Sequence, residues 1–204
     1  MSRTIQTMFE GQPFGVDELG SISSAQKIDS KALYAAYQKL LQTAQVEIIY
    51  VGNENPKIKE LIQTYVDKME RKDVVSLQIS KTSPLHEMKK VTDNMDVVQT
   101  NFMLGARGLP TILDEDYYKT LVMSAVLGVG TASKLFVNVR ERLSLCYFVG
   151  ASYDKFKGVI VFYSGIDQKK IDLTRDEILC QLNLCKKGDI TEDELTAAKK
   201  TYIN

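Results

Sequence analysis

The 204-residue chain has a single histidine, His86, and this scarcity excludes several kinds of catalytic site. A hydrolytic zinc centre usually needs about three protein ligands, with histidine and carboxylate groups most common. Neither H-E-x-x-H nor its inverse H-x-x-E-H occurs in the sequence. Ser-His-Asp and Cys-His mechanisms that use any other histidine are excluded as well. We therefore expect His86 to be an exposed loop residue, and we expect no catalytic residue, metal ligand or bound cofactor in this chain.

Cysteine is also scarce, with only Cys146, Cys180 and Cys185. An odd number of cysteines in a chain of this length indicates reduced thiols and a cytoplasmic location. Cys180 and Cys185 lie five positions apart on a predicted helix, so their side chains point to different faces. This spacing suits neither a disulfide nor a pair of metal ligands.

Long apolar runs and an excess of charge of one sign are both missing. No apolar run approaches the roughly 20 residues that span a bilayer, and no apolar segment typical of a secretory signal follows the first residues. Basic and acidic residues number 26 each, so the formal net charge is zero. This balance argues against binding through phosphate neutralisation. We expect neither a membrane nor a nucleic acid as a partner.

What is present is a mixed series of helical and strand patterns. Apolar residues at helical spacing predict helices over 31–44, 56–71, 117–127 and 170–187, and a helix that carries Arg140. Thr191–Glu194 is a capping box that opens a last helix. Strands are predicted at Val46–Val51, Val74–Ile79, Val97–Leu104, Cys146–Ser152 and Val159–Ser164, the last two as a hairpin, and residues 1–28 read as irregular.

This order of elements predicts an α+β fold in one domain spanning residues 1–204. The helices do not alternate strictly with the strands, and at least one hairpin is expected. We therefore expect an antiparallel-rich sheet with helices packed on one face.

The stretch Ser133–Tyr147 carries the most specific functional signal. Its apolar residues recur at near-helical spacing, so that Arg140 projects from the flank of a helix and Tyr147 follows its end. A guanidinium and a phenol placed together can hold a carbonyl oxygen or a peptide backbone, but they cannot break a bond by themselves. The alternative is that Arg140 belongs to a solvated helix face and Tyr147 is a half-buried strand residue.

A second motif, Gly128–Lys134, is weakly similar to a phosphate-binding loop. It fits neither G-x-x-x-x-G-K-[ST] nor G-x-G-x-x-G, and it follows a helix where a strand is required. A helix C-cap followed by a turn explains it better. A small-molecule-binding α+β domain that uses this turn is the most distant of our alternatives.

A series of short motifs runs along nearly the whole chain in a specific order and spacing. They are Gln12–Gly15, Ile28–Asp29, Val51–Asn53, Asp116–Tyr118, Leu127–Gly130, Ser133–Phe136, Val139–Leu143, Tyr147 and Ile190–Leu195. Together they resemble the C-terminal, zinc-free domain of the insulinase, pitrilysin and mitochondrial processing peptidase family. Gln12–Gly15 resembles the His-Pro-Tyr-Gly turn of that family, and Val51–Asn53 resembles its Val-Gly-Asp strand end.

The resemblance implies an insulinase-type domain with a sheet of about six strands backed by helices on one side. In the family, zinc is held by an H-x-x-E-H motif in a separate N-terminal domain. The C-terminal domain supplies an arginine and a tyrosine, seven positions apart, that grip the substrate peptide. Arg140 and Tyr147 match these two positions, so the resemblance assigns them to substrate binding and transition-state stabilisation.

This sequence departs from the family pattern in ways that limit the expected activity. The zinc domain is absent, so the chain alone should not hydrolyse peptides, and we expect it to be a fragment of a longer protein. Cys146 replaces the small residue that usually precedes the tyrosine. The leading hypothesis is the substrate-holding half of a zinc metallopeptidase. The alternative is an inactive paralogue that assembles with a zinc-bearing subunit. The expected partners are a peptide, the zinc domain or that subunit, and a second copy of the chain.

Overall fold

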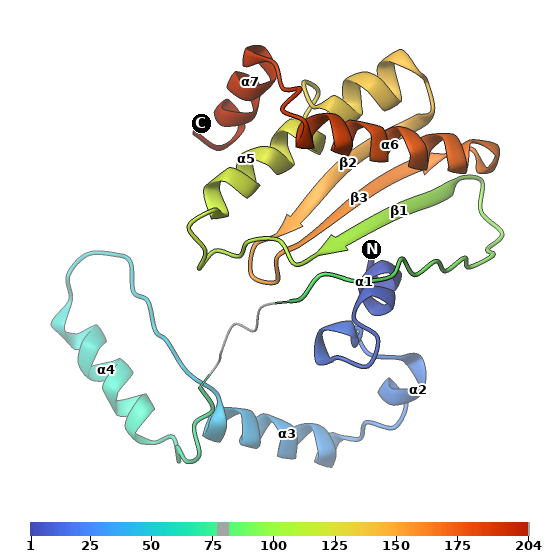
Figure 1. Cartoon of the computed structure of the whole chain (residues 1–204). Helices are drawn as coiled ribbons and strands as arrows, with labels where there is room; N and C mark the ends of the chain where they lie inside the picture. Colours follow the sequence, from blue (N-terminus) through green and yellow to red (C-terminus); the bar gives the residue numbers. More distant parts are fainter. Residues whose placement is uncertain (77–81, 204) are drawn as a thin grey trace. The chain divides into compact units, whose positions relative to one another are not determined.

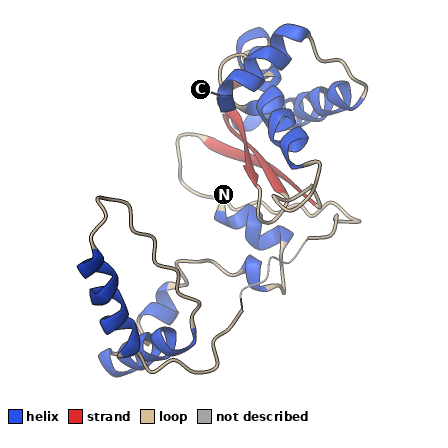
Figure 2. Cartoon of the chain, turned by 90° about the vertical axis from the view of Figure 1, so that its left-hand side faces the viewer, coloured by secondary structure: helices blue, strands red, loops and turns tan. Residues whose placement is uncertain are grey.

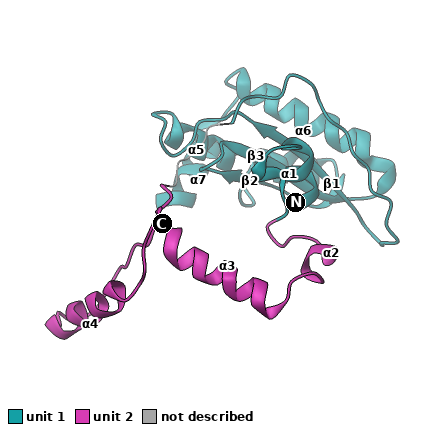
Figure 3. Ribbon diagram, turned by 90° about the horizontal axis from the view of Figure 1, so that it is seen from below, with its two compact units in different colours: residues 1–17, 80–204 teal, residues 18–79 magenta. Residues whose placement is uncertain are grey.

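The computed structural model describes residues 1–76 and 82–203 (Figure 1). Its strands gather in one sheet, and helices make up the rest of the regular structure (Figure 2). The chain divides into two compact units (Figure 3). The first unit comprises Met1–Asp17 and Ser80–Asn204, and the second comprises Glu18–Ile79.

The first unit is built around an antiparallel sheet of three strands in the order β1-β3-β2. These are β1 (Thr100–Arg107), β2 (Cys146–Asp154) and β3 (Val159–Ile166). Strands β2 and β3 form the predicted hairpin, and β1 begins three residues later than predicted. The central strand β3 is buried along almost its whole length. The α+β class and the antiparallel sheet are therefore confirmed.

The expected size of the sheet is wrong, because the described residues form three strands rather than about six. Val46–Val51 forms no strand, and its residues Ile49 and Val51 are 85% and 91% exposed. Residues 74–76 form no strand either, and the rest of the predicted strand Val74–Ile79 lies outside the described residues. A β-branched run favours extended backbone, but a strand also needs a partner ladder, which a local pattern cannot supply.

One face of the sheet is covered by helices α5 (Tyr117–Gly128) and α6 (Ile171–Lys186) and by the π-helix η2 (Phe136–Arg142). The short 3₁₀-helix η3 (Gln168–Lys170) leads into α6, and α7 (Glu192–Ile203) packs on α5. The core on this face consists of Leu127, Leu135, Val139, Ala151, Ile160, Phe162 and Ile178. Helix α5 crosses β2 closely, since a Cβ at Gly128 would lie 2.6 Å from the Ala151 Cβ.

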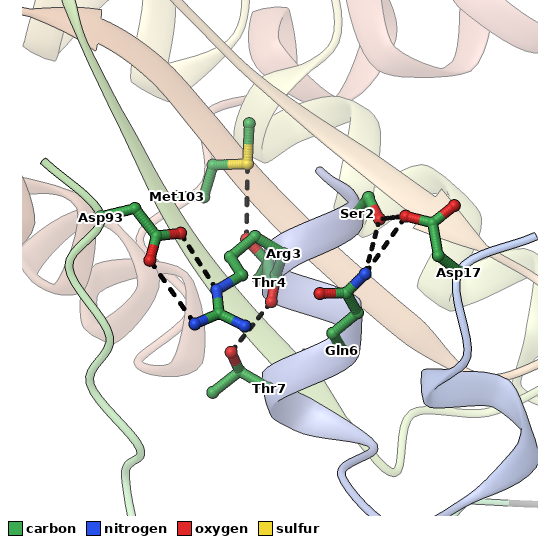
Figure 4. Close-up of polar contacts among 8 residues, drawn as sticks. All are labelled: Ser2, Arg3, Thr4, Gln6, Thr7, Asp17, Asp93 and Met103. Carbon is green, nitrogen blue, oxygen red and sulfur yellow. Dashed lines mark hydrogen bonds and ion pairs between the residues drawn. The ribbon is translucent and has the colours of Figure 1, made fainter. Parts of the chain in front are cut away.

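The other face of the sheet is partly covered by α1 (Ser2–Met8), which corrects the prediction of an irregular start and of helices on one face only. Met8 and Phe9 are buried against Val159 and Val161. Polar contacts attach the helix to its surroundings (Figure 4): Arg3 pairs with Asp93 at 3.0 Å, and the Gln6 amide donates to Asp17 at 3.1 Å. The 3₁₀-helix η1 (Pro13–Gly15) follows. The sequence does not predict α1, because the helix has neither a clear apolar pattern nor a capping residue and is buried by contacts with distant residues of the sheet.

The second unit contains α2 (Ile22–Ala25), α3 (Ser30–Thr43) and α4 (Pro56–Asp67). Helix α3 is capped by Asp29, whose carboxylate accepts from the Ala32 N–H at 2.7 Å. Yet no residue between 18 and 76 is buried. The apolar side of α3 is 54–62% exposed, through Leu33, Tyr34, Tyr37 and Leu40. Taken by itself, the described part of this unit, residues 18–76, has amphipathic helices but no core.

Candidate functional site

Arg140 and Tyr147 lie where η2 runs into β2. η2 is a π-helix, in which the Leu143 N–H donates to the Asn138 carbonyl five residues earlier, at 3.2 Å. Ser144, at φ 48°, ends the helical conformation, and β2 begins two residues later. π-Helical segments are rare and occur frequently at functional sites. The sequence predicts a helix here but not this wider form.

The guanidinium of Arg140 has three defined neighbours. Its Nε donates to the carbonyl oxygen of Tyr147 at 2.9 Å, and its Nη1 donates to Glu141 Oε1 at 3.0 Å. The charged group also lies over the Phe136 ring, 4.7 Å from the ring centroid. A guanidinium engaged in this way loses little further conformational freedom when it binds a ligand. The structure therefore brings Arg140 to Tyr147, but through the backbone rather than through the phenol.

Tyr147 occupies an irregularity in β2 that sets its direction. The pairing register shifts between Cys146, opposite Ile166, and Phe148, opposite Gly165, so Tyr147 is the extra residue of a β-bulge. Bulges commonly redirect a side chain at the end of a strand. Tyr147 is 69% exposed, and across residues 1–76 and 82–203 its hydroxyl makes no hydrogen bond. The phenol is thus open to solvent on a residue whose carbonyl accepts from the Arg140 guanidinium.

The thiol nearest to this pair is not activated. Burial raises the pKa of Cys146, and the opposing effects of Ser164 and Arg140 do not cancel the increase. Burial likewise raises the pKa of Cys185. Both side chains are therefore protonated thiols near neutral pH and weak nucleophiles.

No metal centre emerges from the part of the chain that the structure describes. His86 is exposed and lies in a segment without regular structure. Within the described ranges, no three His, Cys, Asp or Glu side chains are grouped so that they could hold a metal ion. In the same residues, no helix is both long enough and apolar enough to cross a membrane.

Lys134 has a different role from the one that a phosphate-binding loop would give it. The residue is 5% exposed, and its Nζ lies 2.9 Å from Glu194 Oε1 at the start of α7. The ammonium is therefore engaged inside the protein, which does not favour nucleotide binding at Gly128–Lys134. The turn itself behaves as a helix end, with Gly130 at φ 81°.

Lys134 belongs to a group of polar contacts that sequence reasoning missed. We call the group formed by Lys134, Asn138, Glu177, Gln181 and Glu194 the polar seam. It joins η2 and the residues just before it to α6 and α7. The available signal was the four-residue spacing between Lys134 and Asn138 on an otherwise apolar helix.

Comparison with known families gives a match over most of the chain. Residues 27–202 match the family model described as "Peptidase M16 inactive domain". A protein of Bacillus subtilis named "Probable inactive metalloprotease YmfF" is 30% identical over 203 residues, which is 99% of this chain and 47% of that protein. An "Uncharacterized zinc protease" of Rickettsia felis is 32% identical over 108 residues, covering 52% of this chain and 26% of its own length.

Solved structures share the fold. A conserved protein from Enterococcus faecalis V583 superposes with a TM-score of 0.88 at 23% identity, over 98% of this chain and 48% of that one. A peptidase M16 inactive domain from Pseudomonas fluorescens gives 0.76 at 19% identity, over 98% and 49%. The chain spans about half the length of the YmfF relative and of both solved chains.

Proposed function

The chain belongs to the peptidase M16 inactive-domain family, and we propose that it is the non-catalytic, substrate-holding half of a zinc metallopeptidase of this family. In this function the chain binds an extended peptide and presents it to a catalytic centre carried elsewhere. Arg140 and Tyr147 are the residues that hold the peptide.

The supporting observation is that the Arg140 guanidinium is held at the backbone of Tyr147, a residue whose phenol is exposed. Nε is already bonded to the Tyr147 carbonyl, while the Tyr147 hydroxyl is open to solvent. A carbonyl oxygen of an extended peptide, or the oxyanion that develops from it, is an acceptor for both groups. Donors that are held in place before the ligand arrives stabilise such charge without reorganising.

In this proposal, a different domain cleaves the peptide bond. Among residues 1–76 and 82–203, no three His, Cys, Asp or Glu side chains are grouped as zinc ligands would be. The YmfF relative, which is about twice as long, is itself named a probable inactive metalloprotease. The zinc of an active family member would be held in the half that this chain does not match.

The test compares variants in the complete zinc-bearing assembly with a fluorogenic, unstructured peptide as substrate. Arg140→Ala and Tyr147→Phe should lower turnover, by roughly 10- to 100-fold for Arg140→Ala, because a donor to developing charge is lost. The zinc content should remain unchanged. Arg175→Ala, which removes an arginine from the surface of α6, is the control and should retain full turnover. Unaltered turnover in both site variants would refute the proposal.

A second candidate function is assembly with a zinc-bearing catalytic subunit. The coreless second unit favours it, because all of its residues from 18 to 76 have exposed or half-exposed side chains. Exposed apolar surface of this kind marks a site of protein contact. In Val46–Val51, side chains that would lie on both faces of a strand are apolar, which suits a strand covered on both sides. A partner that offers a free sheet edge fits this segment.

A further inference from the structure

The polar seam has two closely packed connections. Lys134 Nζ meets Glu194 Oε1 at 2.9 Å, and the Lys134 side chain is only 6% exposed. The Asn138 amide donates both to the Lys134 carbonyl at 3.0 Å and to Gln181 Oε1 at 3.1 Å. Gln181 is 2% exposed and donates in turn to Glu177 at 2.7 Å. The buried polar groups of the seam are thus paired with one another.

These contacts attach the π-helix to two other helices. Glu194 belongs to α7, where it also accepts the Thr191 N–H at 2.9 Å in the capping box. Gln181 and Glu177 belong to α6. Asn138 lies within η2, only two residues before Arg140. Any rotation of η2 about its axis at Asn138 would therefore be transmitted to Arg140.

A contribution to stability does not by itself explain why polar side chains are buried in the seam. Burying an ammonium and two amides has a desolvation cost, and apolar residues of similar volume often stabilise a core equally well or better. Polar contacts differ from apolar ones because they are directional and fail when a helix turns by one residue. The seam thus discriminates between helical registers in a way that an apolar interface would not.

The register matters because a π-helix competes with an ordinary α-helix. In η2 the Asn138 carbonyl accepts from Leu143, five residues on, whereas an α-helix would pair it with Arg142. A change to the α-helical register would rotate the residues that follow, Arg140 among them. Arg140 Nε would then leave the Tyr147 carbonyl, to which it is now bonded at 2.9 Å.

We propose that Lys134 and Asn138 are positioning residues for Arg140. Through Glu194 and Gln181 they keep η2 in its π-helical register and so direct the guanidinium toward Tyr147. The functional meaning of this inference rests on the proposed peptide-holding role of Arg140. The structural claim can be tested without any peptide.

The experiment measures hydrogen exchange and the NMR chemical shift of the Arg140 Nε–H in the full chain. Lys134→Met and Asn138→Leu keep the side-chain volume but remove the directional contacts. Both variants should speed exchange of the Arg140 Nε–H by about tenfold or more, because its hydrogen bond is no longer maintained. Lys134→Arg, which can still pair with Glu194, should restore the wild-type exchange rate. Lys119→Met, which removes an exposed ion pair with Asp116 on α5, should leave that rate unchanged.

Two results would overturn the proposal. One is wild-type exchange of the Arg140 Nε–H in a folded Lys134→Met or Asn138→Leu variant. The other is equally fast exchange in Lys119→Met, which would indicate a general loss of stability. If Lys134→Met does not fold, Asn138→Leu decides the question. Peptide turnover is not part of this measurement, so failure of the proposed function would leave a positive result standing, and the reverse also holds.

Discussion

Arg140 Nε donates a hydrogen bond to the carbonyl oxygen of Tyr147 at 2.9 Å, so one residue of the candidate site is anchored to the backbone of the other. The contact joins the last turn of η2 to the bulge at the start of β2. The acceptor is the backbone carbonyl, and the Tyr147 residue itself is 69% exposed. In the proposed function, a peptide would bind both side chains while this hydrogen bond stays in place.

Replacing Arg140 by lysine should separate the contribution of the positive charge from that of the directional hydrogen bond to Tyr147. A lysine keeps the positive charge but has no Nε–H in the same plane and cannot form the fork of an arginine. We expect Arg140→Lys to lower the free energy of unfolding by about 1 kcal/mol through the lost hydrogen bond to the Tyr147 carbonyl. Urea denaturation of both proteins measures the difference. A variant as stable as the wild type would show that this contact contributes nothing measurable.

Ionisation of Glu194 should make the free energy of unfolding depend on pH in the acidic range. Partial burial raises the pKa of Glu194. The hydrogen bond from the Thr191 N–H and the Lys134 ammonium together lower the pKa by more than burial raises it, so the pKa lies below its usual value. A carboxyl group with a lowered pKa stabilises the fold above its unfolded pKa of about 4.3, and this stabilisation is lost as the pH falls through the folded pKa. Glu194→Gln should therefore be less stable than wild type at pH 7, by about 1–2 kcal/mol. The difference should shrink below about pH 4. Urea midpoints across this pH range measure it, and a constant difference would contradict the assignment.

Gly128 is expected to be intolerant of a side chain because α5 crosses β2 there. A Cβ at this position would lie 2.6 Å from both the Cβ and the backbone nitrogen of Ala151. Gly128→Ala should destabilise the first unit by about 2–3 kcal/mol through overpacking. Gly188→Ala is the matched control, since Gly188 has φ 81° with no atom within 4 Å of an added Cβ. It should cost about 1 kcal/mol through backbone strain alone. Thermal melts compare the two, and equal losses would refute the packing argument.

The apolar side of α3 should matter for assembly and not for the stability of the isolated chain. Leu33 and Leu40 are 62% and 59% exposed, so Leu33→Asp with Leu40→Asp removes little buried contact. We expect the urea midpoint of the isolated chain to change little, as for most surface substitutions. Binding to a zinc-bearing subunit should be lost in sedimentation experiments. Lys31→Gln with Lys39→Gln on the same helix shifts the net charge by the same two units and is the control for charge. Retained assembly in the leucine variant would contradict the docking role.

Local signals predicted the helices well because a helix satisfies its own backbone. The Thr191 and Glu194 capping box of α7 occurs as the sequence predicts. The failures involve partners that are distant in sequence. Val46–Val51 has the composition of a strand, but none of the described residues forms a ladder with it. Helix α1 is held by Met8, which packs against strand β3 about 150 residues away.

In the candidate site too, features set by neighbouring residues were predictable and features set by distant residues were not. Arg140 reaches the Tyr147 carbonyl where a helix end and a strand start follow each other in the chain, while the joint binding of a peptide by the guanidinium and the phenol stays a prediction. Sequence alone could not show that the Tyr147 carbonyl would be the acceptor, since that depends on the β-bulge. Nor could it show that Lys134 turns inward to Glu194, 60 residues later. Side-chain direction at such points is decided by tertiary packing.

The most direct test of the peptide-holding role is an NMR titration of the full chain with an extended, uncharged peptide that has blocked ends. The predicted result is saturable shifts centred on the Arg140 Nε–H and on the backbone of Tyr147, weakened at least about tenfold in affinity by Arg140→Ala, the equivalent of one charge-assisted hydrogen bond. Saturable binding with shifts confined to other elements, or an affinity unchanged by Arg140→Ala, would contradict the account.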